Sequence, residues 1–317
     1  MIYKLKKLPI ILFLLTIAHI SSAQAYTEEV IINVEKGIRL FGTLTLPEHP
    51  AENYPVILII AGSGPTDRDG NNPKMTNNSY KMLAEELANY GIASLRYDKR
   101  GIGKSEISDF KEDDIIFEDF INDACSCVKY LRSKNIFKRF IILGHSEGAL
   151  IGMVAAKKTD ADAYISVSGA GRPINEVILE QLKKQSPIIY EVAKPIVDSL
   201  KQNLKVKNID PSLMGLFRPS IQNFLINLFK YNPAEIIRTL EIPVLIIQGD
   251  NDIQVNVEDA KILKRNNKSS KLVIIKNMNH VLKEVKTDNY FLQLKTYNDP
   301  ELQLHPKLIK SIVKFIL

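Results

Sequence analysis

The residues best suited to chemistry surround Ser146, in the sequence Gly144-His145-Ser146-Glu147-Gly148. An apolar run at residues 140–143 predicts a strand before this Gly-x-Ser-x-Gly pattern, and residues 149–156 predict a helix after it. A serine on a sharp turn between a strand and a helix holds its hydroxyl clear of the sheet, where it can attack a carbonyl carbon. The pattern predicts that Ser146 is a nucleophile. The alternative is a glycine-rich turn in which the serine only caps the helix.

A serine hydroxyl needs an adjacent base at neutral pH, and that base is usually a histidine oriented by a carboxylate. His280 comes five residues beyond an apolar run at residues 272–275, where a loop would open at the same sheet edge as Ser146. His305 lies directly before the last predicted helix, which is a weaker position. The other histidines are placed less well still: His19, His49 and His145. We predict that His280 is the base, with His305 as the alternative.

The acid is expected between the serine and the histidine along the chain. The loop after the apolar run at residues 244–248 offers two aspartates. Asp252 lies three residues past Gly249, far enough around the turn to point back toward the sheet edge. Asp250 is better placed to bond the backbone of its own turn. We predict that Asp252 is the acid, with Asp250 as the alternative.

Acyl transfer also needs N–H donors for the negative charge that develops on the carbonyl oxygen. One donor is normally the backbone N–H of the residue after the nucleophile, here Glu147. The other is expected in the loop at residues 61–65, whose glycines allow N–H groups to converge. We choose the N–H of Ser63 for this second position of the oxyanion hole, with Gly64 as the alternative.

The same loop continues through Thr66-Asp67-Arg68-Asp69-Gly70-Asn71, which contains Asp-x-Asp-Gly as calcium loops do. With Gly70 in the glycine position of an EF-hand, the twelfth position is Thr76. The bidentate glutamate of that motif is therefore missing, and we expect no metal here. An ion pair of Arg68 that holds the shape of the loop is the preferred interpretation, with substrate contact as the second.

The N-terminus has the pattern of an export signal. Lysines in the first seven residues precede an apolar stretch at residues 9–20, which is followed by Ala23-Gln24-Ala25. This is the order of a signal peptide with a cleavage site. We expect cleavage after Ala25, which predicts a periplasmic or secreted protein with no stable membrane anchor. An uncleaved anchor helix is the alternative.

Composition excludes some function classes. Removal of residues 1–25 would take three lysines with it and lower the formal net charge from +6 to +3. No basic run contains interleaved aromatic residues, so nucleic-acid binding is not expected. The only cysteines, Cys125 and Cys127, lie two apart in a helical pattern and would point to different faces, so no disulfide is predicted.

Apolar runs alternate with helical patterns along most of the chain, which predicts an α/β fold with a doubly wound, mostly parallel sheet. An early helix is expected at residues 79–90, capped by Ser79. We assign residues 26–170 and 241–317 to the core. Residues 171–240 lack a buried-strand pattern and are too many for a structureless loop. They are predicted to form an inserted helical cap over the carboxyl edge of the sheet.

Together these features resemble the α/β-hydrolase superfamily, and more narrowly the secreted or periplasmic bacterial carboxylesterases related to serine-aminopeptidase-like hydrolases. The resemblance covers nearly all of the chain after residue 25. It rests on five segments: Gly62-Ser63-Gly64-Pro65-Thr66-Asp67-Arg68-Asp69-Gly70-Asn71, Tyr97-Asp98-Lys99-Arg100-Gly101-Ile102-Gly103-Lys104-Ser105, Gly144-His145-Ser146-Glu147-Gly148, Gly249-x-x-Asp252 and Met278-Asn279-His280.

The resemblance implies hydrolysis of esters with short or medium acyl chains, a small-molecule substrate and no cofactor. Many relatives have His-Gly where this chain has Ala61-Gly62. That histidine usually supports the oxyanion loop, so the departure leaves open how the loop is held in this chain. The glycines of residues 98–105 are expected to make a tight, structural turn near the site.

Three other functions fit the same residues. A peptidase of this fold would need an acid to anchor a free amine, and the candidates are Glu147, Glu176 and Glu180. A thioesterase would use the same triad. A non-catalytic binding protein would be expected to have a broken triad, and all three predicted positions are intact.

Overall fold

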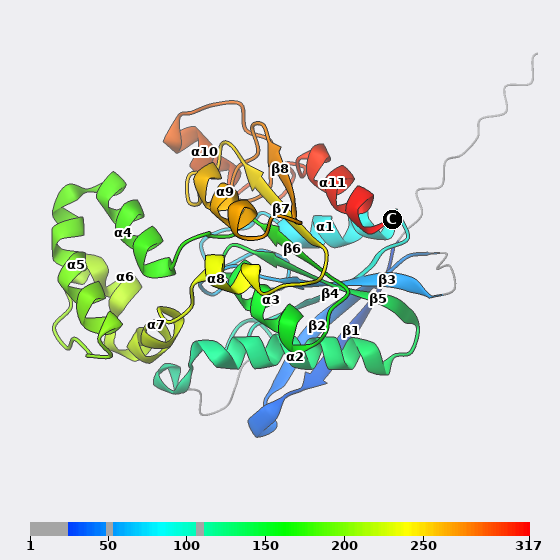
Figure 1. The fold of residues 1–317 in the computed structure, drawn as a ribbon, viewed down its shortest axis with the longest axis horizontal. Coiled ribbons are helices and arrows are strands. Elements are labelled where there is room, and N and C mark those ends of the chain that lie inside the picture. The colour runs from blue at the N-terminus through cyan, green and yellow to red at the C-terminus, as the bar shows by residue number, and fades with distance from the viewer. Residues whose placement is uncertain (1–24, 49–52, 106–110) are drawn as a thin grey trace, which may run out of the picture.

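The computed structural model describes residues 25–48, 53–105 and 111–317. In this part of the chain eight strands form one sheet, in the order β1-β2-β4-β3-β5-β6-β7-β8 (Figure 1). The strands are β1 (Tyr26–Asn33), β2 (Arg39–Leu46), β3 (Tyr54–Ile60), β4 (Ala93–Tyr97), β5 (Phe137–His145), β6 (Ala163–Val167), β7 (Val244–Gly249) and β8 (Lys271–Ile275).

From β3 to β8, at least one α-helix separates each strand from the next along the described part of the chain. The α-helices in this part of the chain are α1 (Ser79–Ala88), α2 (Phe117–Ser133), α3 (Glu147–Lys158), α4 (Ile174–Gln185), α5 (Pro187–Lys201), α6 (Met214–Phe217), α7 (Gln222–Leu228), α8 (Pro233–Arg238), α9 (Val257–Asn266), α10 (Tyr290–Thr296) and α11 (Pro306–Ile316). No helix among the described residues is long and apolar enough to cross a membrane.

The direction of each strand follows from its connection. β1 and β2 are joined by a short turn, so they pair antiparallel, and β2 is also antiparallel to β4. From β4 across to β8 every neighbouring pair is parallel, because the chain crosses back through a helix between successive strands. The predicted doubly wound, mostly parallel α/β sheet is confirmed.

Both faces of the sheet are covered, which explains why its central strands are apolar without a break. In β3, Val56, Leu58 and Ile60 pack in one hydrophobic cluster with residues of α2, α3 and α9. Ile57 and Ile59 point to the opposite face and pack in a second cluster with residues of α1 and α11. Two helical layers therefore enclose the strands, and the loops at the carboxyl ends of the strands are built on this base.

The interval between β6 and β7 contains α4 to α8 and no strand. In Figure 1, α4, α5, α6 and α7 form a group of helices to one side of the sheet. This group is tied to the core at both ends. Near its start, Arg172 bonds Asp259 of α9 at 2.8 Å, and near its end the ring of Phe224 packs edge-on against Phe117 of α2.

One local expectation is wrong. Ser79 does not cap α1 but is its first residue, and the side chain of Asn77 accepts the N–H of Ser79 at 2.9 Å. The hydroxyl of Ser79 is used elsewhere, since it donates to the carbonyl of Val281 at 2.7 Å. This bond ties the start of α1 to the loop that carries His280.

Candidate active site

Ser146 lies on a strained turn between β5 and α3. Its φ is +55° and its ψ is −121°, a backbone conformation that residues other than glycine rarely adopt. The flanking glycines are required by contact. A Cβ on Gly144 would lie 2.0 Å from the carbonyl oxygen of Gly148, and a Cβ on Gly148 would lie 2.4 Å from that of Ile60. The turn therefore keeps the half-buried Ser146 at the carboxyl edge of the sheet.

Asp252 and His280 meet at the same edge of the sheet, after β7 and β8. Asp252 Oδ2 lies 2.8 Å from His280 Nδ1, and the Asp252 side chain is fully buried. Because the carboxylate accepts at Nδ1, that nitrogen carries the proton and Nε2 keeps its lone pair. This is the tautomer that a general base acting through Nε2 requires.

The carboxylate of Asp252 is saturated with hydrogen bonds. Oδ1 accepts the backbone N–H groups of Gln254 at 2.8 Å and Val255 at 3.0 Å. Oδ2 accepts the side-chain amide of Gln248 at 3.1 Å in addition to His280. Burial by itself would raise the pKa of Asp252, but His280 and these bonds outweigh it and hold the pKa below its usual value. Asp252 is therefore ionised at neutral pH.

The loop that carries His280 is fixed by its neighbour Asn279. The N–H of Asn279 donates to the carbonyl of Lys283 at 3.0 Å, and its side-chain oxygen accepts the Lys283 N–H at 2.9 Å. Its amide also donates to Thr296 of α10 at 2.8 Å. Among the described residues no hydrogen bond joins Ser146 Oγ to His280, and such contacts often tighten only when substrate binds.

The two alternatives for the triad have other partners. Asp250 is exposed, and its Oδ1 accepts the backbone N–H of Asn277 at 2.6 Å. His305 caps α11, since its Nδ1 accepts the N–H of Lys307 at 3.2 Å, and its Nε2 lies 3.1 Å from the carbonyl oxygen of Lys276. Both side chains serve turns of the backbone rather than the pair formed by Asp252 and His280.

His145 links the oxyanion loop to the loop of His280. Its Nε2 lies 2.8 Å from the carbonyl oxygen of His280, which can only accept, so Nε2 carries the proton. Nδ1 then accepts the hydroxyl of Tyr80 at 2.7 Å. The same hydroxyl accepts the N–H of Gly62 at 3.1 Å. This buried chain of hydrogen bonds involves Tyr80 of α1, a residue that sequence reasoning missed because it falls on an ordinary apolar helix stripe.

The protonation of His145 predicts a dependence of stability on pH. Burial, with a smaller contribution from His280, lowers the pKa of His145 from 6.5 to about 3. The folded state therefore keeps His145 neutral while the unfolded chain takes up a proton below pH 6.5. The unfolding free energy therefore keeps its full value above pH 6.5 and decreases as pH falls toward 3. At pH 4 the decrease is about 3 kcal/mol.

We expect His145→Gln to flatten the fall in unfolding free energy between pH 6.5 and pH 4, as measured by denaturant titration at a series of pH values. The internal reference is the unfolding free energy of each protein above pH 6.5, where His145 is neutral in both the folded and the unfolded state. Parallel curves for the wild-type protein and His145→Gln would contradict the assignment of a neutral, buried His145.

The predicted oxyanion loop lies directly against the serine. A Cβ on Gly62 would lie 3.1 Å from Cβ of Ser146, which is tighter than an ordinary contact, so a larger residue would fit only if its neighbours shifted slightly. Among the described residues no hydrogen bond uses the N–H of Ser63. Glu147 is the first residue of α3, so its N–H has no acceptor within the helix. Both predicted donors are thus available at this edge of the sheet.

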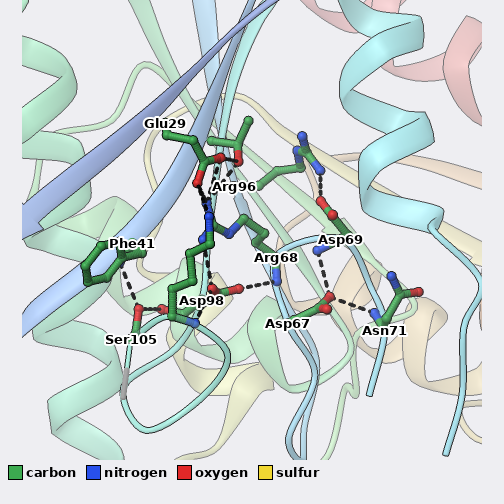
Figure 2. A network of polar contacts seen from close by, with 11 residues as sticks. Glu29, Phe41, Asp67, Arg68, Asp69, Asn71, Arg96, Asp98 and Ser105 are labelled. Atoms are coloured by element: carbon green, nitrogen blue, oxygen red, sulfur yellow. Dashed lines mark hydrogen bonds and ion pairs between the residues drawn. The ribbon is translucent and has the colours of Figure 1, made fainter. Parts of the chain in front are cut away.

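The segment at residues 66–71 forms a structural network, shown in Figure 2. The guanidinium of Arg68 bonds Asp98 at 3.0 Å and Glu29 at 3.1 Å, and the Arg68 backbone N–H donates to the other oxygen of Asp98 at 2.9 Å. Asp67 accepts the backbone N–H groups of Asp69 and Asn71, both at 2.9 Å. These aspartates are occupied by N–H donors.

The same network joins the two loops that follow β3 and β4. Asp98 also accepts the backbone N–H of Lys104 at 3.0 Å, and its carbonyl accepts the hydroxyl of Ser105 at 2.9 Å. Among the described residues no group of three or more His, Cys, Asp or Glu side chains could hold a metal ion. Cys125 and Cys127 are free cysteines, with no disulfide between them.

Removal of the Arg68 guanidinium is expected to destabilise the fold. The Arg68 and Asp98 side chains are both nearly buried, so Arg68→Met leaves a buried carboxylate without its cation. The expected loss of unfolding free energy is about 3 kcal/mol. The control is Lys104→Met, which removes an exposed cation from the same Glu29 and should cost less than about 1 kcal/mol. Equal losses in denaturant titrations of the two variants would contradict this account.

Comparison with known proteins identifies relatives of this architecture. The chain is 29% identical to Esterase EstD from Thermotoga maritima over 76% of its own length, and it spans 57% of the length of that relative. It is 23% identical to a proline iminopeptidase from Saccharolobus solfataricus, over 86% of this chain and 95% of that one.

Solved structures share the fold. The structure of Est1E from Butyrivibrio proteoclasticus with bound ferulic acid has a TM-score of 0.60 at 21% identity, and the match covers 90% of this chain and 98% of that one. The esterase Pf2001 from Pyrococcus furiosus has a TM-score of 0.56 at 17% identity, and the match covers 92% of both chains.

The model of the serine aminopeptidase S33 family matches residues 75–284. This range includes Ser146, Asp252 and His280 and extends over more than half of the 317-residue chain. Because the match covers most of the chain and the sheet has the corresponding topology, this protein belongs to the serine aminopeptidase S33 family of α/β-hydrolases.

Proposed function

We propose that this protein is a serine esterase that hydrolyses carboxylic esters of short or medium acyl chains. The observation that carries the proposal is the bond between Asp252 and His280 at 2.8 Å, at the sheet edge where the strained turn presents Ser146. The name of the relative from Thermotoga maritima, Esterase EstD, supports the same activity.

The proposed reaction is acyl transfer in two steps. His280 Nε2 takes the proton of the Ser146 hydroxyl as its oxygen attacks the ester carbonyl, and the N–H groups of Ser63 and Glu147 bind the oxyanion. The C–O bond to the alcohol breaks as His280 returns the proton to the leaving oxygen. Water then attacks the acyl-enzyme by the same route and releases the carboxylic acid.

Peptide hydrolysis is the second candidate, because the family is named for aminopeptidases and one relative is an iminopeptidase. Of the acids that could anchor a free amine, Glu180 already bonds Lys184 and Arg172, each at 2.6 Å. Burial raises the pKa of Glu147, although the nearby charge of Lys99 opposes this shift, so its carboxylate is poorly suited to hold an ammonium. These features favour an ester substrate over an N-terminal amine.

A fluorophosphonate probe separates an enzyme from a binding protein. We expect the probe to label the wild-type protein and not Ser146→Ala. A panel of p-nitrophenyl acyl esters and aminoacyl arylamides then separates the two activities, and we expect turnover of the esters with a preference for short or medium chains. Faster turnover of the arylamides would replace the esterase proposal with the peptidase. Acyl thioesters in the same panel test the thioesterase alternative.

We further propose that residues 171–240 act as a cap over the acyl site and that the protein is exported. The signal peptide at residues 1–25 falls almost entirely outside the described residues. Export is tested by fractionating cells that express the full chain with a C-terminal tag. A mature protein whose first residue is Tyr26, in the periplasm or medium, is expected, whereas an intact N-terminus in the membrane fraction would indicate an anchor.

A further inference from the structure

Lys99 is a buried cation beside the oxyanion loop. It follows β4, whose parallel neighbour β3 leads into that loop, and only 3% of its surface is exposed. Its ammonium donates to the carbonyl oxygen of Gly62 and, at 3.0 Å, to that of Gly64. A lysine ammonium has three donors and no acceptor, so this group clamps two backbone carbonyls of one short loop.

The clamp determines where the N–H of Ser63 points. The carbonyl of Gly62 and the N–H of Ser63 belong to the same peptide unit, and in a trans peptide the two groups point in opposite directions. An ammonium that holds the carbonyl on one side therefore turns the N–H toward the other side. The hydroxyl of Thr66 holds the next carbonyl, that of Ser63, at 3.0 Å. The loop is thus held at three consecutive carbonyls.

We propose that Lys99 is a positioning residue that holds the oxyanion loop and aims the Ser63 N–H at the carbonyl oxygen of the substrate. This inference rests on the ester hydrolysis proposed above. It also answers how the loop is supported in a chain with Ala61 in place of histidine, since Lys99 holds the carbonyls of the loop and Tyr80 holds the N–H of Gly62.

The positive charge of Lys99 also strengthens the oxyanion donor, in addition to fixing the position of the loop. A cation on a carbonyl oxygen polarises the peptide unit and makes its N–H a stronger donor. The ammonium lies 5.7 Å from the centre of the Phe120 ring. Burial lowers the pKa of Lys99, and the nearby carboxylate of Glu147 opposes this shift and favours the charged form. Phe120 packs against Phe224 of α7, so the support of the loop is continuous with the packing between the core and the α4–α8 interval.

The central variant is Lys99→Met, which keeps most of the side-chain volume and removes the donors. Deletion of one oxyanion donor lowers kcat by about 10²–10³ in other enzymes, and a donor that is misdirected rather than deleted should lose less. We expect kcat for a p-nitrophenyl ester to fall about 10- to 100-fold while KM stays within about threefold. The matched control is Lys104→Met, an exposed lysine in the same segment, which should retain wild-type kinetics.

A trifluoromethyl ketone provides a readout that a purely structural role would not change. The oxygen of Ser146 adds to the carbonyl carbon of this probe, and the adduct carries an oxyanion. The inhibition constant of the ketone therefore reports on the oxyanion hole. The inhibition constant of a carboxylate product reports on binding in the ground state. For Lys99→Met we expect the inhibition constant of the ketone to rise in proportion to the loss in kcat and that of the carboxylate to stay constant.

Chemical rescue covers the case in which Lys99→Met folds poorly. Lys99→Ala removes the atoms of n-propylammonium, so this cation can refill the position. We expect propylammonium to restore kcat of Lys99→Ala by at least about tenfold, and 1-propanol, which fills the space without charge, to restore much less.

The outcomes separate this proposal from the proposed function. Ester turnover by the wild-type protein that survives in Ser146→Ala would overturn the esterase mechanism and the role of Lys99 with it. Ser146-dependent turnover with an unchanged kcat in Lys99→Met would overturn the role of Lys99 alone. Equal rescue by propanol and propylammonium would also overturn it, because packing and not the ammonium would then support the loop.

Discussion

Ser146→Ala is expected to lower kcat for ester hydrolysis by a factor on the order of 10⁴ to 10⁶, the range seen when the nucleophile of a serine triad is removed. The loss is this large because no acyl-enzyme can form without the hydroxyl, and what remains is the binding of substrate beside the oxyanion donors. KM should change little, since the hydroxyl contributes little to ground-state binding.

The measurement is steady-state hydrolysis of a p-nitrophenyl ester, together with fluorophosphonate labelling. The control is Ser133→Ala, at the end of α2 on the exposed surface, which should keep wild-type activity. Alanine fits the turn as well as serine does, so the denaturation midpoint of Ser146→Ala should match that of the wild-type protein. A folded Ser146→Ala protein with more than about one per cent of wild-type activity would refute the assignment.

The second large effect is expected from Asp252→Asn, which should lower kcat by about 10⁴. The amide keeps the volume of the carboxylate, but its nitrogen can donate to Nδ1 of His280. The imidazole would then carry its proton on Nε2, the position that must accept the proton of Ser146. The amide also has no negative charge to stabilise the imidazolium that forms during the reaction.

Asp250→Asn is the matched control, because it makes the same chemical change two residues away. Asp250 is exposed and accepts one backbone N–H through an oxygen that asparagine retains, so we expect kcat within about threefold of wild type. Assays of the two variants side by side decide the identity of the acid. A large loss in Asp250→Asn with an active Asp252→Asn would reverse the assignment.

The features that could be predicted from sequence are those encoded by neighbouring residues. The turn at Ser146 is specified by glycines two residues on either side, since any Cβ there would collide with backbone. The strands are specified by apolar runs that pack on two faces. The seven residues of α10 make too few turns to show a clear apolar period, so the sequence does not predict this helix.

In the candidate site, too, some features follow from the sequence and others only from the fold. Elimination among the histidines and the order of strands led to His280 and Asp252, because the carboxyl ends of parallel strands share one edge of the sheet. Sequence order carried no information about Gln248 as a partner of Asp252. It also left Glu180 open as an amine anchor, and only the fold showed that Arg172 and Lys184 occupy it.

The sequence by itself determined the strained serine turn, the alternation of strands and helices, and the order of the three triad candidates. Only the tertiary structure decided what supports them. The carbonyl of Gly62 meets Lys99 across 37 positions of the chain, and Tyr80 meets His145 across 65. Such contacts depend on which strands become neighbours and on how helices pack over them. A lysine in a glycine-rich turn and a tyrosine on an apolar helix stripe carry no local signal of the groups they will hold.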